Sequence, residues 1–396
     1  MRKIYLYAIL IAFVYSCESP QTTETSAELP LENQIENFEI REVGTKHIHV
    51  GESSSNIPHQ FALFNDSLLY TRTMFTPYSF DVYNLNEGKF SNRIELDKNL
   101  MKGNPHGFNI QSDGSFMTSG LGTSIIQKSN EDFTKFDIYD FSNVNMYSKG
   151  SNNAKASFPA GFKGSTLNMI DENHLLVNFW ILPKYDGGQN QAHVALLNMR
   201  DLTVERYYDI PDNAYTKSES RSYTNDLAMA YCTITDDTLL VSYPMDDMIY
   251  GYNLNESDIK FIKDGSSNQK IDIPAPQTRA ENNDRQLSWD FRASTPYYSP
   301  LYYHSNKELF TRILAHPFDL EYVDGKMVTG RARKLSVLIF DKQLNKVGET
   351  VLDNTLFDIF YHVPTSNGFF VGPSSEFINE EDSLIFNTYF ELIKTN

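Results

Sequence analysis

Six short segments of the chain share one pattern, a turn-forming residue followed by an apolar strand. The turn residue is Asp or Asn in every copy, and both suit tight turns because they hydrogen-bond their own backbone and tolerate left-handed conformations. Successive copies begin 47 to 69 positions apart, which indicates an irregular internal repeat. The six turn residues are Asp66, Asp113, Asn173, Asp237, Asn306 and Asn367. Such a chain is expected to fold as copies of one small unit.

Each copy predicts the same strands. A large apolar residue stands three positions after the turn residue and a small residue two positions later, as in Leu69 and Thr71. A second apolar run, clearest at residues 82–87 and 251–256, predicts a third strand that ends in a turn, and a fourth often follows. Helical periodicity is almost absent beyond the N-terminal segment, so no helices are expected.

The repeats predict an all-β, six-bladed β-propeller with four antiparallel strands per blade. Radial stacking of blades buries both faces of each sheet and leaves only short edges. Only nine residues follow Asn387, which is short for a turn and an outer strand. A strand from residues 38–50 is therefore expected to complete the last blade and lock the ring. A two-sheet β-sandwich with insertions is the alternative, and six copies of one motif favour the ring.

The N-terminal segment predicts export. Arg2 and Lys3 precede an apolar run at residues 4–14, which is too short to span a bilayer and reads as a signal peptide. Val14-Tyr15-Ser16-Cys17 resembles the bacterial lipobox, although Tyr15 is bulkier than usual, and predicts cleavage after residue 16 and a lipid on Cys17. An ordinary cleaved signal with a stray cysteine is the alternative. We expect a signal peptide at 1–16, a polar tether at 17–37 and a single propeller domain at 38–396.

The charge and cysteine content narrow the possible partners. The 396-residue chain has a net charge of −17, and removing residues 1–16 with Arg2 and Lys3 lowers it to −19. Such an acidic surface repels phosphate backbones, so no nucleic-acid partner is expected. With Cys17 lipidated, Cys232 has no partner for a disulfide. Cys232 stands in an apolar strand, so it is expected to be a core residue.

The lipobox, the six irregular repeats and an acidic, Asn/Tyr/Phe-rich composition together resemble the uncharacterised six-bladed propeller lipoproteins of Bacteroidetes. The resemblance covers essentially the mature chain and implies a propeller fold with a lipid anchor in the outer membrane of a bacterial envelope. Because that family has no settled activity, the resemblance implies no catalytic residues.

Long insertions indicate where a site could lie. They fall between blades or between the second and third strands of a blade, and these connections share one face of a propeller, where loops commonly carry function. The insertions are residues 183–192, 211–226, 264–300 and 315–334. The second strands point toward that face at Arg72, Tyr243 and Arg312, and the two arginines could bind a carboxylate or phosphate. Ordinary ion pairs with loop carboxylates are the alternative.

Other candidates on that face have a structural alternative as well. His59 and His106 enter the first two blades after a proline and could approach the channel mouth, or could be hydrogen-bonded packing residues. Trp289 could cap the channel or stack on a sugar, or could anchor its loop as a buried aromatic. Asp246 and Asp247 are better explained by turns and solvation than by acid–base catalysis. His47 and His49 lack a third ligand, so neither a metal nor a cofactor is expected.

The sequence therefore predicts a lipid-anchored extracytoplasmic binding or scaffold module. Its ligand would be a glycan, a peptide or an envelope protein engaged by the loop-rich face. The alternative is an envelope enzyme, a hydrolase, lyase or lactonase, because propellers can assemble a site from separate blades without any linear motif. Converging Asp, Glu or His side chains at the channel mouth would indicate an enzyme, whereas aromatic and amide side chains would indicate binding.

Overall fold

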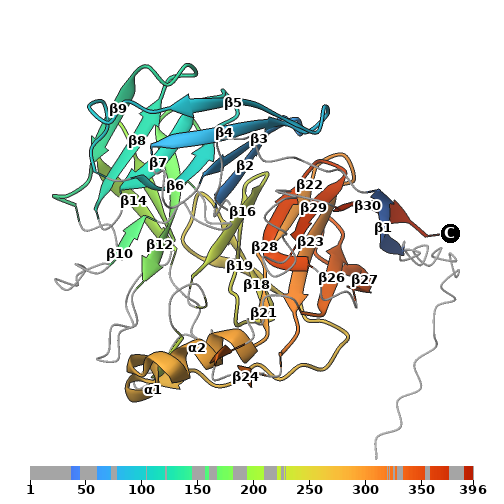
Figure 1. The fold of residues 1–396 in the computed structure, drawn as a ribbon. Coiled ribbons are helices and arrows are strands. Elements are labelled where there is room, and N and C mark those ends of the chain that lie inside the picture. The colour runs from blue at the N-terminus through green and yellow to red at the C-terminus, as the bar shows by residue number, and fades with distance from the viewer. Residues whose placement is uncertain are drawn as a thin grey trace, which may run out of the picture. The chain divides into compact units, whose positions relative to one another are not determined.

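The described part of this computed structural model comprises residues 37–44, 60–72, 78–103, 105–120, 123–144, 157–159, 167–181, 194–208, 221–223, 227, 229–318, 320, 322–323, 326–327, 333–352, 357–373 and 388–395. All of them lie in the second of two compact units, Glu36–Asn396. The elements of this unit are labelled in Figure 1. The signal peptide and the tether, with Cys17, lie outside the described residues.

The first three blades are antiparallel sheets in chain order. Blade 1 contains β2 (Gln60–Phe64), β3 (Leu68–Arg72), β4 (Ser79–Asn84) and β5 (Lys89–Glu95). Blade 2 contains β6 (Pro105–Ile110), β7 (Phe116–Gly120), β8 (Ile125–Ser129) and β9 (Phe136–Asp140). In blade 3 the innermost strand is split, and its pieces β10 (Ser157–Pro159) and β11 (Leu167–Met169) both pair with β12 (His174–Ile181), which is followed by β13 (Val194–Asn198) and β14 (Thr203–Tyr208).

The remaining blades repeat this plan. Blade 4 contains β16 (Tyr231–Thr235), β17 (Thr238–Ser242), β18 (Met248–Asn253) and β19 (Ile259–Asp264). Blade 5 again has a split inner strand, β21 (Tyr297–Tyr298) and β22 (Tyr302–His304), followed by β23 (Leu309–Ala315), β26 (Leu335–Phe340) and β27 (Lys346–Leu352). Blade 6 contains β28 (Phe357–Pro364), β29 (Gly368–Pro373), β30 (Thr388–Lys394) and β1 (Phe38–Gly44). The prediction of six four-stranded blades is confirmed.

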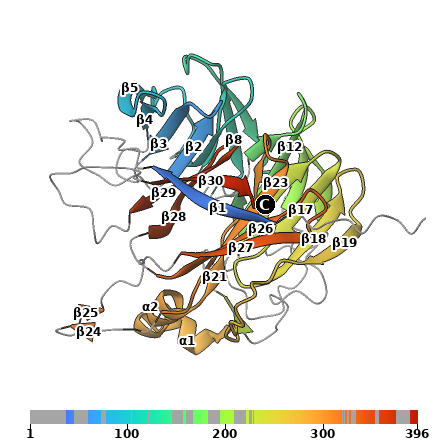
Figure 2. The same ribbon diagram turned by 90° about the vertical axis from the view of Figure 1, so that its right-hand side faces the viewer.

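The sixth blade joins the two ends of the domain. β1 pairs antiparallel with β30, with Ile40 opposite Leu392, and forms the edge of that sheet. Figure 2 shows β1 between β30 and β27. The backbone of β1 comes so close to β27 that a Cβ atom on Gly348 would collide with the carbonyl group of Phe38. That this pairing locks the ring stays a prediction, and residues 45–50 of the expected strand lie outside the described residues.

The core lies between blades. Six buried clusters each join one blade to the next, and one of them joins blade 6 to blade 1 through Val363, Phe370, Leu69 and Tyr83. The large apolar residue of each repeat is buried in these clusters, whereas the small residue two positions on, such as Thr71, lies buried beside it. Burial of apolar surface between neighbouring sheets therefore holds the blades in a ring.

Short polar residues occupy several of the tight turns of the blades. Asp66 and Asp236 adopt left-handed φ angles of 52° and 47°, which short polar side chains tolerate. At the turn after the third strand, the Oδ1 atoms of Asn84 and Asn253 accept hydrogen bonds from the backbone amides two residues on, at 2.9 and 3.0 Å. We call the face formed by these turns the turn face, and the opposite face, reached by the longer connections, the loop face.

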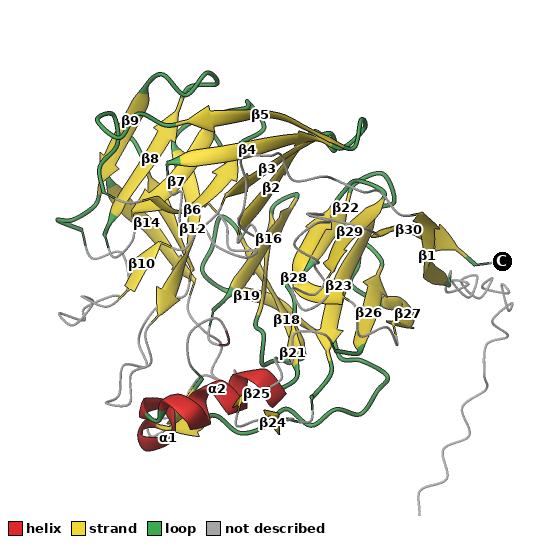
Figure 3. Ribbon diagram, viewed as in Figure 1, coloured by secondary structure: helices red, strands yellow, loops and turns green. Residues whose placement is uncertain are grey.

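The absence of helices was predicted wrongly. The connection from blade 4 to blade 5 contains α1 (Arg279–Asn283) and α2 (Arg285–Ser294), shown in red in Figure 3. Thr278 and Glu281 form a capping box at α1, and the carboxylate of Asp284 caps α2. Two ribbons also lie outside the blades, β15 (Arg221–Ser222) with β20 (Gln277–Thr278) and β24 (Tyr322–Val323) with β25 (Lys326–Met327). Among the described residues no helix is long and apolar enough to cross a membrane.

Candidate functional site

Arg312 on β23 lies inside the protein. Its side chain is fully buried, and its two terminal nitrogens donate hydrogen bonds of 2.7 to 3.1 Å to the backbone carbonyl groups of Tyr243, Asp246 and Asp247 in blade 4. The guanidinium carbon lies 4.0 Å from the ring centroid of Tyr298, and burial lowers the pKa of the group. Its partners are carbonyl oxygens and a ring, and this placement favours a structural clamp between blades over ligand binding.

Arg72 is also buried and has a similar role at a different interface, between blades 1 and 2. It lies at the end of β3, and its Nη1 donates a 3.0 Å hydrogen bond to the carbonyl oxygen of Pro105 at the start of blade 2. Burial lowers the pKa of its guanidinium to about 10, and the ring of Phe108 lies 5.9 Å away. The predicted arginine pair thus occupies two different blade interfaces, from blade 1 to blade 2 and from blade 5 to blade 4.

Tyr243 and the acidic pair beside it belong to the Arg312 clamp. Tyr243 is buried, and its carbonyl oxygen accepts a hydrogen bond from Arg312. The predicted solvation of Asp246 is wrong, because its carboxylate is buried and accepts a 2.7 Å hydrogen bond from the Tyr250 hydroxyl. Burial, together with the charges of Asp246 and Asp264, raises the pKa of Asp247. This turn is held by internal hydrogen bonds.

The other predicted residues are scattered. His59 lies outside the described residues, and His106 lies in β6 with its side chain outside the described part. Trp289 projects from α2 with 48% of its surface exposed. Cys232 is buried between blades 3 and 4, as predicted. The candidate side chains that the structure describes therefore do not converge on one site. The insertion at 183–192, with residues 211–220, 224–226 and part of 315–334, lies outside the described residues.

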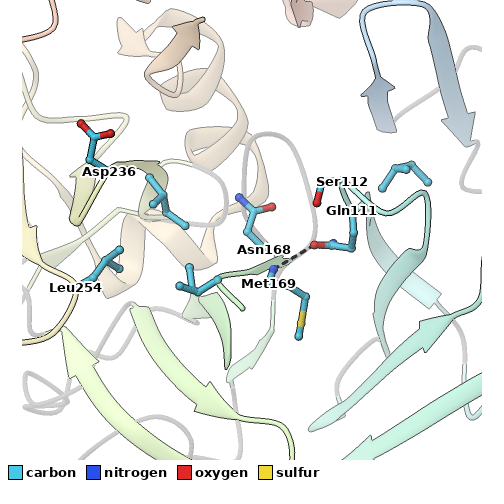
Figure 4. A pocket seen from close by; sticks show the side chains of 9 residues that line it. Gln111, Ser112, Asn168, Met169, Asp236 and Leu254 are labelled. Atoms are coloured by element: carbon cyan, nitrogen blue, oxygen red, sulfur yellow. Dashed lines mark hydrogen bonds between the residues drawn. The ribbon is translucent and has the colours of Figure 1, made fainter. Parts of the chain in front are cut away.

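A pocket of about 350 Å³ opens on the turn face. It is lined by residues of blades 2, 3 and 4, seen in Figure 4: Ile110, Gln111, Ser112, Asn168, Met169, Ile170, Ile234, Asp236 and Leu254. These residues stand where inner strands end and tight turns begin. The pocket therefore lies on the face opposite to the one that the insertions indicated.

Amide side chains shape this pocket. Gln111 bridges blade 2 to blade 3, because its Nε2 donates to the Leu167 carbonyl group at 2.8 Å and its Oε1 accepts from the Met169 amide at 3.1 Å. Asn168 accepts a hydrogen bond from the side chain of Asn109 across the same interface. The wall of the pocket is thus preorganised by hydrogen bonds between blades.

One side of the pocket is held by a hydrogen-bonded turn. The turn that follows Ile170 is closed by His174, whose Nδ1 lies 2.7 Å from a carboxylate oxygen of Asp171 and whose Nε2 lies 3.0 Å from Glu205. These carboxylates raise the pKa of His174. The His174 carbonyl oxygen also accepts a 2.8 Å hydrogen bond from the Ile170 amide, which links this turn to the wall of the pocket.

Aliphatic and amide side chains make up most of the lining of this pocket. Five of its nine side chains are aliphatic or thioether, three carry an amide or a hydroxyl, and Asp236 supplies one carboxylate. Within the described residues no group of three or more His, Cys, Asp or Glu side chains could hold a metal ion. Sequence reasoning missed the pocket because its walls come from three blades, and each short turn by itself is typical of a propeller.

The fold and this site define a six-bladed β-propeller with a pocket at the turn face. Residues 37–351 match the family described as a domain of unknown function, DUF4221. The match covers most of the chain, which therefore belongs to the DUF4221 family. No curated protein matches the chain.

Two solved structures are similar to this chain over most of its length. A member of the DUF4221 family from Bacteroides vulgatus has 14% sequence identity and a TM-score of 0.68, and the alignment covers 91% of this chain and 100% of that one. A protein from Bacteroides fragilis named "Putative exported protein" has 10% identity and a TM-score of 0.51, with 91% and 96% covered. At these identities the likeness concerns the fold.

Proposed function

We propose that this propeller is an exported, lipid-anchored binding or scaffold module of the bacterial envelope. Its ligand is a glycan, a peptide or an envelope protein. The observation that carries the proposal is the lining of the turn-face pocket, where amide and aliphatic groups surround a single carboxylate. General acid–base chemistry needs at least one titratable group within reach of the reacting atoms and usually a second one to complement it.

The same lining favours a peptide in this pocket. Ile110, Ile170 and Ile234 offer apolar contacts, and Gln111 and Asn168 lie beside them as hydrogen-bonding amides. Apolar side chains next to backbone amides are the chemistry of a peptide. No aromatic ring lines the pocket on which a sugar could stack. Asp236 adds an exposed carboxylate that can pair with a cationic group of the peptide. In the free protein this carboxylate lies 3.8 Å from the ammonium group of Lys342.

Filling the pocket is expected to abolish peptide binding. Ser112→Tyr places a bulky side chain on an exposed turn residue at the pocket wall, so the fold should tolerate it. We expect wild-type protein to select peptides from a random display library and S112Y to bind the selected peptides at least tenfold more weakly by calorimetry. Lys135→Tyr is the matched control, because Lys135 is an exposed turn residue of the same blade that does not line the pocket.

The enzyme alternative predicts a different result. If the protein hydrolyses, cleaves or delactonises envelope polysaccharides or small esters, product will accumulate, and S112Y will slow turnover more than K135Y. Turnover of this kind, or equal peptide binding by S112Y and wild type, contradicts the proposed binding role of the pocket.

The lipid anchor is supported by the lipobox at Cys17 and by the name of the Bacteroides fragilis structure, which calls that protein exported. We expect Cys17→Ser to abolish labelling of the protein by radioactive palmitate and to move it from the membrane pellet to the soluble fraction, because one serine cannot receive the thioether-linked lipid. Cys232→Ser is the control and should leave the labelling unchanged. Labelled C17S protein would contradict the anchor.

A further inference from the structure

Trp289 lies on the outer, polar side of α2. At about 100° per residue, Trp289 is about 200° around the helix from Leu287, whereas Arg285, Gln286 and Arg292 all lie within about 60° of it. Phe291 faces the core, where it packs against the cluster between blades 5 and 6. An amphipathic surface helix carries polar residues on its outer side. Trp289 is therefore a large aromatic residue placed where folding calls for a polar one.

The helix that presents Trp289 is held rigidly. The Asp284 carboxylate accepts hydrogen bonds from the amides of Gln286 and Leu287 at 2.9 and 3.0 Å. The ring of Phe291 lies 6.2 Å from that of Tyr223. At the C-terminal end, the carbonyl group of Ser294 accepts a 3.1 Å hydrogen bond from the Phe318 amide. Trp289 is thus displayed by a fixed element on the loop face, at a small cost in ordering when a ligand binds.

Polar side chains surround the exposed ring. The guanidinium of Arg292 lies over one part of the indole, with its central carbon 5.3 Å from the ring centroid. Arg285 is exposed and stands seven positions before Arg292, so it lies on the same side of the helix as Arg292. On the other side, Gln286 donates a 2.7 Å hydrogen bond to the carboxylate of Asp290. On the surface of the helix, Trp289 therefore stands between two arginines on one side and an amide–carboxylate pair on the other.

We propose that Trp289 is the stacking platform of a saccharide site on the loop face, selective for sugars that carry a carboxylate. The C–H face of a sugar ring packs on an aromatic face, and a rigid aromatic side chain supplies this contact at little entropic cost. Arg285 and Arg292 pair with the sugar carboxylate, and guanidinium groups suit that geometry. This proposal rests on the proposed function, because an exported binding module is exposed to saccharides of this kind.

Two other ligand classes fit these residues less well. Docking to a membrane or to a protein surface needs a contiguous apolar patch. Leu287, the other exposed apolar residue of α2, lies on a different side of the helix from Trp289. An apolar ring with polar residues on both sides suits a carbohydrate. The C–H face of the sugar packs on the ring, and the hydroxyl groups at its edges lie beside the polar residues.

The test is binding of the mature protein, carrying Cys17→Ser, to an array of acidic and neutral oligosaccharides. We expect signal on carboxylated sugars such as oligogalacturonate, and weaker signal on the neutral galacto-oligosaccharide. Trp289→Ala should weaken the acidic signal by about tenfold, the size of a lost aromatic contact. Arg292→Gln should weaken binding to acidic sugars only. Leu287→Ala is the matched control, similar in exposure to Trp289, and should bind as wild type does.

Further measurements separate this site from the pocket. S112Y should keep its saccharide signal, and W289A should keep its peptide binding, so either site can fail without the other. Thermal unfolding of W289A within a degree of wild type shows that the fold is intact. No saccharide signal, a signal that W289A retains, or equal binding of acidic and neutral sugars overturns the proposal. Trp289-dependent binding to phosphatidylglycerol vesicles without any saccharide signal also overturns it.

Discussion

Replacing Arg312 with methionine is expected to lower the free energy of unfolding by roughly 3 kcal/mol. Methionine fills part of the buried volume but donates no hydrogen bond. The carbonyl oxygen of Asp246 would lose its 2.7 Å donor, and Tyr298 would lose the cation stacked on its ring. The carbonyl group of Asp247 keeps a second donor, the Gly265 amide, which limits the loss. Chemical denaturation followed by circular dichroism measures the change.

Two further variants serve as controls for the effect of Arg312→Met on stability. Arg200→Met removes an exposed arginine from a turn of blade 3 and should change the free energy of unfolding by less than about 0.5 kcal/mol. Arg312→Lys keeps the positive charge but cannot reach three carbonyl groups at once, so it should lose most of the same stability. Burying the charge of an arginine costs free energy of desolvation. Replacing a buried charged residue with an apolar one therefore sometimes leaves the stability unchanged. If R312M unfolds like wild type, the clamp contributes no net stability.

Acid is expected to destabilise the interface between blades 5 and 6, and the loss should begin near about pH 6.5, before carboxylates titrate. His304 is buried, with Nδ1 2.8 Å from the Thr365 carbonyl oxygen and Nε2 2.7 Å from the Thr311 hydroxyl, and burial lowers its pKa to about 4. His362 packs against Tyr302 and Phe369, and burial, together with His304, lowers its pKa well below the usual value. Burial therefore favours the neutral form of both imidazoles in the folded protein.

The direction of the effect follows from the lowered pKa values. Above about pH 6.5 both histidines are neutral whether the chain is folded or unfolded. Below that pH the unfolded chain takes up protons that the folded chain does not, so stability falls with decreasing pH. The shift of His304 alone amounts to about 3 kcal/mol by pH 4. His174 acts in the opposite direction, because Asp171 and Glu205 raise its pKa, but its partly exposed position makes its effect smaller.

Denaturation between pH 7 and pH 4 tests this expectation. In that range the fall in unfolding free energy per pH unit should be smaller in His304→Gln than in wild type, even if the variant is less stable at pH 7. His174→Gln is the control and should make the fall steeper or leave it unchanged. A fall that is identical in wild type and H304Q would show that other groups govern the acid response.

Much of the fold could be predicted because it is encoded locally. Asn84 closes its turn through its own side chain, which accepts a hydrogen bond from the backbone amide two residues on, and this needs no information from distant residues. The alternation of large and small residues along each second strand follows from packing between sheets. The helix α2 was missed because ten residues in a long connection are too few for a periodic signal, and its caps become visible only with its position known.

The candidate site depended on contacts that no local pattern encodes. Arg312 donates hydrogen bonds to carbonyl groups 65 to 69 positions away. The sequence alone does not distinguish an arginine with such internal partners from an arginine that binds a ligand. The pocket combines Gln111 with Asn168 and Asp236, which are brought together only when three blades stack.

The sequence by itself thus determined the repeat, the six blades and the predicted export signal at Cys17, because turns, strand alternation and signal peptides are properties of short segments. Only the tertiary structure decided that Arg72 and Arg312 are clamps, that a pocket opens on the turn face, and that Trp289 stands on the polar side of a capped helix. Burial and hydrogen bonding between blades depend on the angle and distance at which neighbouring sheets meet, and these are set by the packing of the whole ring.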